Sequence, residues 1–328
     1  MRVKMNNIKL TIAIPTYNGA SNICETLDSI LVQMQAGVDI IISDNASTEN
    51  TSEIIKEYQS RYPYIKYYCN DENLGADSNF DLAVRRSEGE FVWLFSDDDI
   101  MMPGAIRKVM SILSEYQNLV AIYVNYSVYS IDLVTCIQEY GIEIEKDKLC
   151  TNGNQFLDTV MQGPGFISAD VVNRAIWMDT DVTPYMGTNW VQFGTVLNMV
   201  ENRLSYCIAN PYIKLRVGAI RWAGNGQFFL NMLNFIKILQ DLQKLHYKPA
   251  VVNKTINIVM QSWSLTISSA KRDGLDVNIS LIKRMVEMFG GTLSLWLWYL
   301  PMLLVPNFTY RLVYGKHLKP IFKKLVGR

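Results

Sequence analysis

Short apolar runs alternate with amphipathic stretches through the first third of the chain. The apolar runs at 8–14, 38–42, 64–68 and 91–95 predict four strands. Apolar positions between and after them recur at helical spacing. This alternation, with short links, is typical of an α/β fold with a doubly wound, mainly parallel sheet. The helices are expected from a Ser21 cap to about Met34, over 51–62, over 76–86, and onward from Pro103.

The pattern after residue 118 is less regular and divides the chain. Beyond residue 227, apolar periodicity predicts helices only. We therefore expect an α/β domain over 1–220 and a helical region over 221–328, with Gly218, Gly224 and Gly226 near the boundary. The remaining expected strands are 119–131, 166–172 and 205–217, and the remaining expected helices are 189–200, 228–245, 251–268 and 277–289.

Charge follows the same division. Residues 1–218 hold 16 Lys and Arg against 27 Asp and Glu, whereas residues 219–328 hold 15 against 4. A basic region of this kind favours a polyanionic partner, either nucleic acid or an acidic membrane surface. The five cysteines are scattered, which predicts reduced thiols in a cytoplasmic protein and no zinc site, and the start of the chain lacks the apolar core of a secretory signal.

Polar residues stand at the end of each of the first four predicted strands. Because ligands bind at the carboxyl ends of parallel strands, these residues are expected to converge on one rim. Three consecutive acids, Asp97, Asp98 and Asp99, end the fourth strand. A divalent cation, Mg²⁺ or Mn²⁺, on Asp98 and Asp99 would offset their repulsion. The alternative is an ordinary solvated turn or a helix cap.

Four stretches in order resemble the motif set of family 2 glycosyltransferases with the Rossmann-like GT-A fold. They are TIAIPTYN (11–18), IIISDNASTENT (40–51), NLGADSNFDLAV (73–84) and FVWLFSDDDIMMP (91–103). Three later stretches, at 163–177, 185–200 and 210–226, are similar to the abequosyltransferase branch, whose members add a dideoxyhexose to an O-antigen unit. Neither a dinucleotide-binding G-x-G-x-x-G nor a P-loop follows any predicted strand, which argues against a dehydrogenase or a P-loop enzyme.

The resemblance implies roles for particular residues. Asp44 matches the acid that recognises the edge of the nucleotide base, and Asp98 and Asp99 match the metal-binding acids. The family usually has D-x-D-D where this chain has Ser96 first, so Asp97 is left without a role. The other matches to donor-nucleotide contacts are Pro15, Thr16, Tyr17, Asn73, Gly75 and Asn79.

The general base is harder to place. Where family members commonly carry Glu-Asp at a helix start, this chain has Thr188 and Asn189, and an amide is a poor proton acceptor. Asp181 is the favoured substitute, with Asp179 and Asp170 as alternatives. Trp190 is a candidate for stacking on an acceptor sugar, although a tryptophan at helical spacing is commonly part of a core.

A stretch of 23 residues without charge, Met288–Tyr310, precedes a tail with six Lys and Arg and no acid over 307–328. Pro301, Pro306 and the pair Gly290-Gly291 argue against a clean membrane-spanning helix. We expect this segment to lie in the membrane interface, with packing in a helical core as the alternative. A nucleic-acid partner is not expected, because the tail carries no known binding fold.

Together these observations predict a metal-dependent, inverting glycosyltransferase on the cytoplasmic face of a bacterial inner membrane. Its donor would be a nucleoside-diphosphate sugar, such as that of a dideoxyhexose, and its acceptor a lipid-diphosphate-linked oligosaccharide of O-antigen or lipopolysaccharide synthesis. Two alternatives stay open: a sugar-1-phosphate nucleotidyltransferase, and a non-catalytic scaffold of the same fold.

Overall fold

The computed structural model describes residues 9–217 and 226–313. These residues fall into two compact units, the first comprising residues 9–217 and 242–252, and the second comprising residues 226–241 and 253–313. The expected boundary glycines Gly218 and Gly224, and the basic tail over 314–328, lie outside the described residues.

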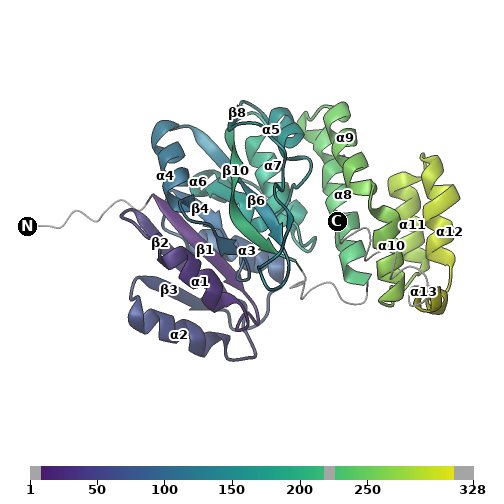
Figure 1. Ribbon diagram of the computed structural model, residues 1–328. Helices are drawn as coiled ribbons and strands as arrows, with labels where there is room; N and C mark the ends of the chain where they lie inside the picture. The colour runs from purple at the N-terminus through teal and green to yellow at the C-terminus, as the bar shows by residue number, and fades with distance from the viewer. Residues whose placement is uncertain (1–8, 218–225, 314–328) are drawn as a thin grey trace, which may run out of the picture. The chain divides into compact units, whose positions relative to one another are not determined.

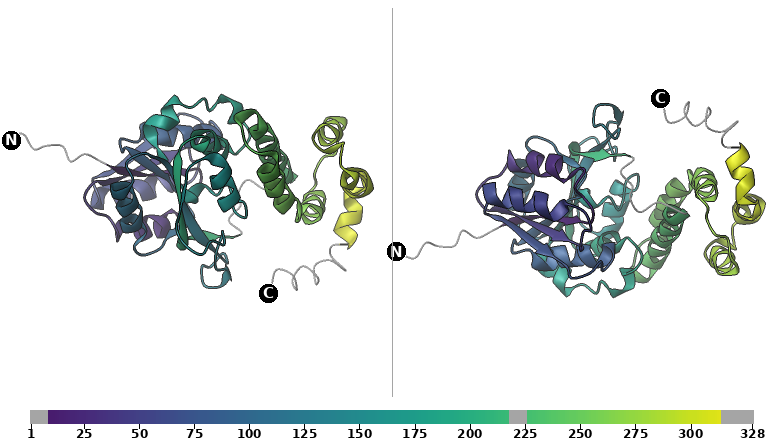
Figure 2. Two further views of the ribbon diagram at one scale, coloured as in Figure 1. Left: turned by 90° about the horizontal axis from the view of Figure 1, so that it is seen from above. Right: turned by 90° about the horizontal axis from the view of Figure 1, so that it is seen from below.

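The first unit is built on a ten-stranded mixed sheet with the path β3-β2-β1-β4-β9-β6-β10-β5 (Figure 1). Its first four strands are parallel, as the alternating pattern predicts. Helices cover both faces, with α1 and α2 on one and α3 on the other (Figure 2). The strands are β1 Leu10–Thr16, β2 Val38–Asp44, β3 Ile65–Cys69, β4 Phe91–Leu94, β5 Ile100–Met101, β6 Leu119–Tyr129, β7 Cys136–Gln138, β8 Lys148–Cys150, β9 Asp170–Asn173 and β10 Leu204–Arg216.

The centre of the sheet is fully buried because its strands are apolar on both faces. Ile12, Ile41 and Trp93 are completely excluded from solvent, which is the expected environment for parallel strands covered by helices. The flanking helices are α1 Ile23–Leu31, α2 Thr51–Arg61, α3 Ala76–Arg86, α4 Ala105–Glu115, α5 Gly153–Val160, α6 Arg174–Asp179 and α7 Val191–Val200.

Three local expectations differ from the structure. The first helix begins at Ile23, and the backbone N–H of Ile23 donates to the carbonyl of Gly19, so Ser21 is not the cap. The helix expected from Pro103 begins at Ala105, after Gly104 in a left-handed conformation (φ +85°). The strand expected over 166–172 starts only at Asp170, and it inserts antiparallel between β4 and β6.

The second unit is helical, as its apolar periodicity predicts. Trp263 is its buried centre and packs edge-on against Phe229, Phe289 and Tyr299, with ring centroids 5.1–5.6 Å apart. The expected helix over 251–268 is two helices, which meet at Gln261–Ser262. The helices in this part of the chain are α8 Gln227–Asp241, α9 Pro249–Met260, α10 Trp263–Arg272, α11 Ile279–Phe289, the π-helical η5 Leu295–Tyr299, α12 Leu300–Leu304 and α13 Asn307–Val313. The first four residues of α9 belong to the first unit.

The uncharged segment is buried on one side and exposed on the other. Leu295, Leu300 and Leu303 are buried within the second unit, whereas Trp296 and Trp298 are 52% and 65% exposed. Within the described ranges, no helix combines the length and the apolar character needed to cross a membrane. One side of η5 and α12 therefore packs in a core and the other side is exposed.

Candidate functional site

The carboxyl ends of β1, β2 and β3 are tied together by backbone hydrogen bonds. Thr16 pairs with Asp44 in the parallel register of β1 and β2. The N–H of Asn45 donates to the carbonyl of Thr16 (2.9 Å), and the N–H of Asn70 donates to the carbonyl of Asp44 (2.8 Å). The loop after β4 joins the same edge, because the Thr16 hydroxyl donates to Oδ2 of Asp97 (2.5 Å). The polar strand ends thus form one rim.

Asp44 is completely buried at this rim. Its Oδ1 accepts from the N–H (2.9 Å) and the hydroxyl (2.6 Å) of Ser47, and its Oδ2 accepts from the hydroxyl of Tyr67 (2.7 Å). Burial and the bond to Asp44 raise the pKa of Tyr67, so the phenol remains a donor. Ser47 and Tyr67 therefore enclose this carboxylate, and a nucleotide base would reach Asp44 only after one of these side chains moved.

Asn45 organises the loop that leads into α3. Its amide donates to Oδ1 of Asn73 (2.8 Å) and to the carbonyl of Gly75 (3.1 Å), and its Oδ1 accepts from the N–H of Leu74 (3.0 Å). Gly75 has φ +83° and ψ 164°, a conformation that is essentially reserved for glycine. Asn73 and Gly75 are exposed, so the loop presents its backbone to solvent at the rim.

Asn79 has a structural position under the rim. It is buried, its amide donates to the carbonyl of Ser43 (2.8 Å), and its Oδ1 accepts from the hydroxyl of Ser43 (2.8 Å). Arg86 completes this network through Ser43 (2.8 Å) and Asn70 (2.7 Å). Pro15 and Thr16 are buried as well, whereas Tyr17 is 40% exposed.

The three acids after β4 have different environments. Asp97 is buried against Thr16 and Gly19, where any added Cβ on Gly19 would lie 2.3 Å from the Asp97 carboxylate. Asp98 is partly exposed, and its Oδ1 accepts from the hydroxyl of Ser96 (2.5 Å). Asp97 has no role assigned from the sequence, and its contact with Thr16 depends on strand order, which the local sequence pattern does not reveal.

Asp99 faces into the protein. Its Oδ2 accepts from the hydroxyl of Ser168 (2.6 Å) and its Oδ1 from the N–H of Arg216 (3.2 Å). Burial, with the neighbouring charge of Asp98, raises the pKa of Asp99 well above its usual value. Arg216 also donates to the Asp98 carbonyl (3.0 Å) and pairs with Glu25, so it holds the acidic loop in place.

The residues present fit a divalent cation through Asp98 more readily than through Asp99. Mg²⁺ commonly takes one or two carboxylates together with phosphate oxygens of a substrate. Asp98 is a partly exposed hard-oxygen donor at the rim, whereas the Asp99 oxygens are occupied inside the protein. Within 9–217 and 226–313, no group of three or more His, Cys, Asp or Glu side chains is arranged to hold a metal ion.

The predicted acceptor side is joined to the donor side through Asp77. This buried acid in the first turn of α3 accepts from the N–H of Asn189 (2.8 Å) and of Val191 (3.0 Å), at the start of α7. Asn189 has a left-handed φ of +64°. Trp190 is partly exposed beside it, so the structure brings Asn189 and Trp190 next to the loop that carries Gly75.

The candidate bases lie in contrasting surroundings. Asp181 is exposed before the short 3-10 helix η2 (Thr183–Tyr185), and its Oδ1 accepts from the N–H of Thr183 (3.0 Å). Hydrogen bonds from Thr183 lower the pKa of Asp181. Asp179 is exposed, whereas Asp170 is buried with one oxygen unpartnered, and burial raises its pKa well above the usual value.

Comparison with known sequences finds similar proteins for the first part of the chain. Residues 11–147 match the model of the glycosyl transferase family 2. Over 113 residues the chain is 34% identical to the abequosyltransferase RfbV of Salmonella typhimurium, covering 34% of each protein. Over 108 residues it is 30% identical to the GalNAc(5)-diNAcBac-PP-undecaprenol beta-1,3-glucosyltransferase of Campylobacter jejuni, covering 33% of this chain and 35% of the other.

Solved structures extend the fold match to nearly the whole chain. The 1–349 fragment of S. aureus TarS with UDP-GlcNAc superimposes with a TM-score of 0.62 at 14% identity, covering 94% of this chain and 92% of the other. The mannosyltransferase PcManGT of Pyrobaculum calidifontis, with GDP-Man and Mn²⁺, gives 0.52 at 14% identity, covering 95% and 88%.

The α/β sheet and the polar rim therefore define a GT-A fold, as the sequence predicts. Residues 11–147 match the model of the glycosyl transferase family 2, the family that the four motifs resemble, and an abequosyltransferase is among the similar proteins. The chain spans about a third to just over a half of the length of the first curated relatives it matches.

Proposed function

We propose that this protein transfers a sugar from a nucleoside-diphosphate sugar to a lipid-diphosphate-linked oligosaccharide of O-antigen or another surface polysaccharide. The observation that carries the proposal is the partly exposed carboxylate of Asp98 at the polar rim of a family 2 domain. One relative is named for abequosyl transfer and another for glucosyl transfer to an undecaprenyl-linked chain. We extend both features to this chain, with a dideoxyhexose donor and an inverting transfer.

The donor nucleotide would lie along the rim. Asp44 would accept a hydrogen bond from the base, and Tyr17 and the loop of Asn73 and Gly75 would contact the nucleoside. Asp98 would hold Mg²⁺ or Mn²⁺, with Asp99 shaping the loop behind it. When bound, such a cation neutralises diphosphate charge and so stabilises the leaving group.

Asp181 is the proposed general base. A base has to be ionised before it can accept a proton, and an exposed aspartate such as Asp181 is ionised at neutral pH. Its exposure leaves it open to an acceptor hydroxyl, whereas Asp170 is enclosed. Trp190 would contact the acceptor sugar.

The enzyme would work at the cytoplasmic face of the inner membrane as a peripheral or monotopic protein. Support comes from the exposed apolar cluster on η5, α12 and α13 and from the basic sequence that follows it. This cluster consists of Leu293, Trp296, Leu297, Trp298, Leu304 and Phe308, which are 52–73% exposed. Aromatic and basic residues together favour an anionic bilayer surface.

Calorimetric titration tests the donor site. UDP, CDP, GDP and dTDP are each titrated with Mn²⁺ and again with EDTA into wild type, Asp98→Ala and the control Asp276→Ala, an exposed acid of the second unit. We expect one pyrimidine diphosphate to bind only with Mn²⁺, and to lose binding in Asp98→Ala but not in the control. Preference for CDP would favour a dideoxyhexose donor, and no binding by any of the four would reject the proposal.

One specific observation favours a scaffold function. Asn189 has an amide at the position where members of the family commonly carry an acid. Transfer assays separate the two functions. Asp181→Asn should lower kcat at least about a hundredfold if Asp181 is the base. Full nucleotide binding by wild type without any turnover of nucleotide sugar or acceptor would instead favour the scaffold.

A further inference from the structure

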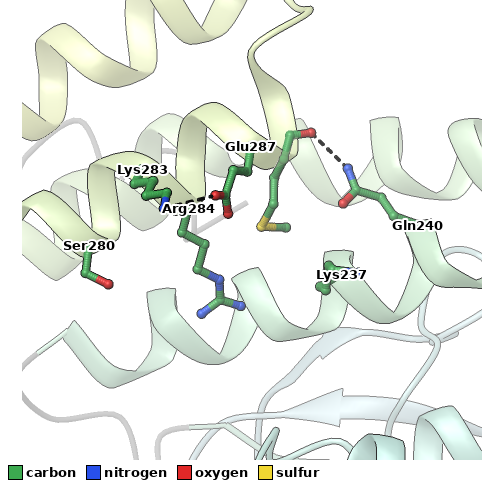
Figure 3. A pocket seen from close by; sticks show the side chains of 7 residues that line it. Lys237, Gln240, Ser280, Lys283, Arg284 and Glu287 are labelled. Atoms are coloured by element: carbon green, nitrogen blue, oxygen red, sulfur yellow. Dashed lines mark hydrogen bonds and ion pairs between the residues drawn. The ribbon is translucent and has the colours of Figure 1, made fainter.

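The second unit has an open pocket of about 630 Å³ between α8 and α11. Its size is typical of sites for small ligands. Figure 3 shows side chains from both helices directed toward it. The residues lining it are Lys237, Gln240, Ser280, Lys283, Arg284, Glu287 and Met288.

Arg284 is the least exposed of the cations that line this pocket. Its side chain is only partly exposed, and Nη2 donates to Oδ1 of Asn234 (2.6 Å), a neutral amide. Burial lowers the pKa of Arg284. Within the described ranges Arg284 has no acidic partner closer than 4.0 Å. A guanidinium stays charged in proteins, so this site favours an anionic ligand.

The other charges in the pocket leave a net positive site. Lys283 lies 3.9 Å from Glu287 on the next turn of α11, and Lys237 pairs with Asp241 along α8. Both lysines are at least half exposed, so these pairs are weak and the ammonium groups can turn toward a ligand. Three cations and one carboxylate line the pocket, with the Ser280 hydroxyl at one end (Figure 3).

We propose that this pocket binds the diphosphate of the lipid-linked acceptor, an inference that rests on the proposed function. A guanidinium and flexible ammonium groups suit the several oxygens and the charge of a diphosphate. The source is assigned to a lipid because the same unit exposes the apolar cluster of Leu293, Trp296, Leu297, Trp298, Leu304 and Phe308. The second unit would thereby bind the acceptor by its diphosphate.

The first test is calorimetric titration of the full chain with inorganic pyrophosphate and with farnesyl diphosphate, both in EDTA so that metal-dependent binding at the rim is absent. Arg284→Gln should weaken both at least about tenfold, because it removes a charged hydrogen-bond donor. Lys237→Gln should weaken them less, and Arg284→Lys should restore part of the affinity. Lys254→Gln, an exposed charge on α9, is the matched control and should bind as wild type.

Equal binding of pyrophosphate by wild type, Arg284→Gln and Lys237→Gln would overturn the proposal. Circular dichroism of each variant excludes misfolding as the cause of a loss. The donor titration described above is repeated on Arg284→Gln, and CDP or UDP binding should be unchanged. If the donor nucleotide binds but the pocket variants bind pyrophosphate like wild type, only the pocket proposal is rejected. If the pocket variants lose pyrophosphate but no donor nucleotide binds, the proposed function is rejected and, with it, the acceptor as the source of the diphosphate.

Vesicle flotation distinguishes the sources of phosphate. Vesicles of phosphatidylcholine carrying a polyprenyl diphosphate should retain wild type more than vesicles of the same surface charge made with phosphatidylglycerol. Arg284→Gln should remove most of that difference. Equal retention by the two vesicles would show an unspecific anionic surface and overturn the assignment to a lipid-borne diphosphate.

Discussion

The carboxylate of Asp77 accepts a hydrogen bond of 2.8 Å from the backbone N–H of Asn189, 112 residues later in the chain. Asp77 lies in the first turn of α3, two residues after Gly75 of the proposed donor loop. Asn189 lies two residues before the start of α7 and next to the proposed acceptor contact, Trp190. One buried acid therefore connects the two sides of the candidate site. Because the same carboxylate also accepts from Val191, it acts as a cap for α7 supplied by another helix.

Removing this acid should loosen the start of α7. Asp77→Ala leaves buried N–H groups without an acceptor, which costs about 1–3 kcal/mol of unfolding free energy. In transfer assays we expect kcat to fall more than the KM for the donor rises, because Asp77 positions the acceptor side without lying on the exposed rim. Urea unfolding and steady-state kinetics measure both effects. Asp71→Ala, an exposed acid before the same loop, is the control, and equal behaviour of the two variants would contradict the positioning role.

Gly75 gives a prediction about backbone conformation. Its φ and ψ of +83° and 164° strain any other residue, so Gly75→Ala should cost about 1–3 kcal/mol or distort the loop. Nucleotide binding should weaken with it, as calorimetry would show. Gly291→Ala provides the contrast, since nothing lies within 4 Å of its added Cβ and its φ is not positive. If Gly75→Ala and Gly291→Ala have the same unfolding free energy and the same nucleotide affinity, the positive-φ conformation of Gly75 is not required for stability or binding.

The buried carboxyl group of Asp170 should make the unfolding free energy depend on pH. Burial raises its pKa above the value of 3.8 expected when unfolded, so the folded state binds more protons across that window. Stability should therefore fall as pH rises from 3.8 through the folded pKa, by up to about 1.4 kcal/mol per pH unit for one group. Asp170→Asn should flatten this slope in urea unfolding followed from pH 5 to pH 8.

Asp181→Asn is the comparison with the opposite sign. Its folded pKa is lowered, so its contribution to stability is complete above pH 3.8 and is lost only as pH falls through the folded pKa. It should leave the slope between pH 5 and pH 8 unchanged. If Asp170→Asn has the same slope as wild type, the pH dependence comes from another buried acid, such as Asp99.

The exposed tryptophans of η5 predict binding to lipid. Trp296→Ala combined with Trp298→Ala should reduce retention on phosphatidylglycerol vesicles by about tenfold or more. Moving one large apolar side chain from water into an apolar environment is favourable by about 1.5–3 kcal/mol. Ile279→Ala, an 85% exposed apolar residue on α11, controls for general loss of surface hydrophobicity. Unchanged flotation of the double variant would remove the membrane role of this surface.

Local pattern was enough for the parallel half of the first unit and for its rim. The strands that end at Thr16 and Asp44 lie where alternation predicts them, and their polar ends meet because parallel strands share an edge. The break between α9 and α10 was not predicted, since neither glycine nor proline interrupts the apolar period at Gln261–Ser262. Helix periodicity reports which face is apolar and not where the chain turns.

The long-range contacts of the site are beyond such patterns. Asp97 meets Thr16, and Asp99 meets Ser168 and Arg216, only because strand order brings distant segments together. Nothing near Asp77 in the sequence indicates that it caps a helix over a hundred residues later. The local motif places a residue at a strand end, whereas its protonation and partners depend on the whole sheet.

The antiparallel insertion of β9 between β4 and β6 has a consequence for synthesis of the protein. During translation β4 leaves the ribosome with one neighbour available, β1, and its other edge stays open until Asp170–Asn173 has been made. Open strand edges are sites of mispairing between nascent chains. The apolar Phe91–Leu94 strand is thus the segment for which a delay in elongation, or a truncated product ending before residue 170, most favours aggregation.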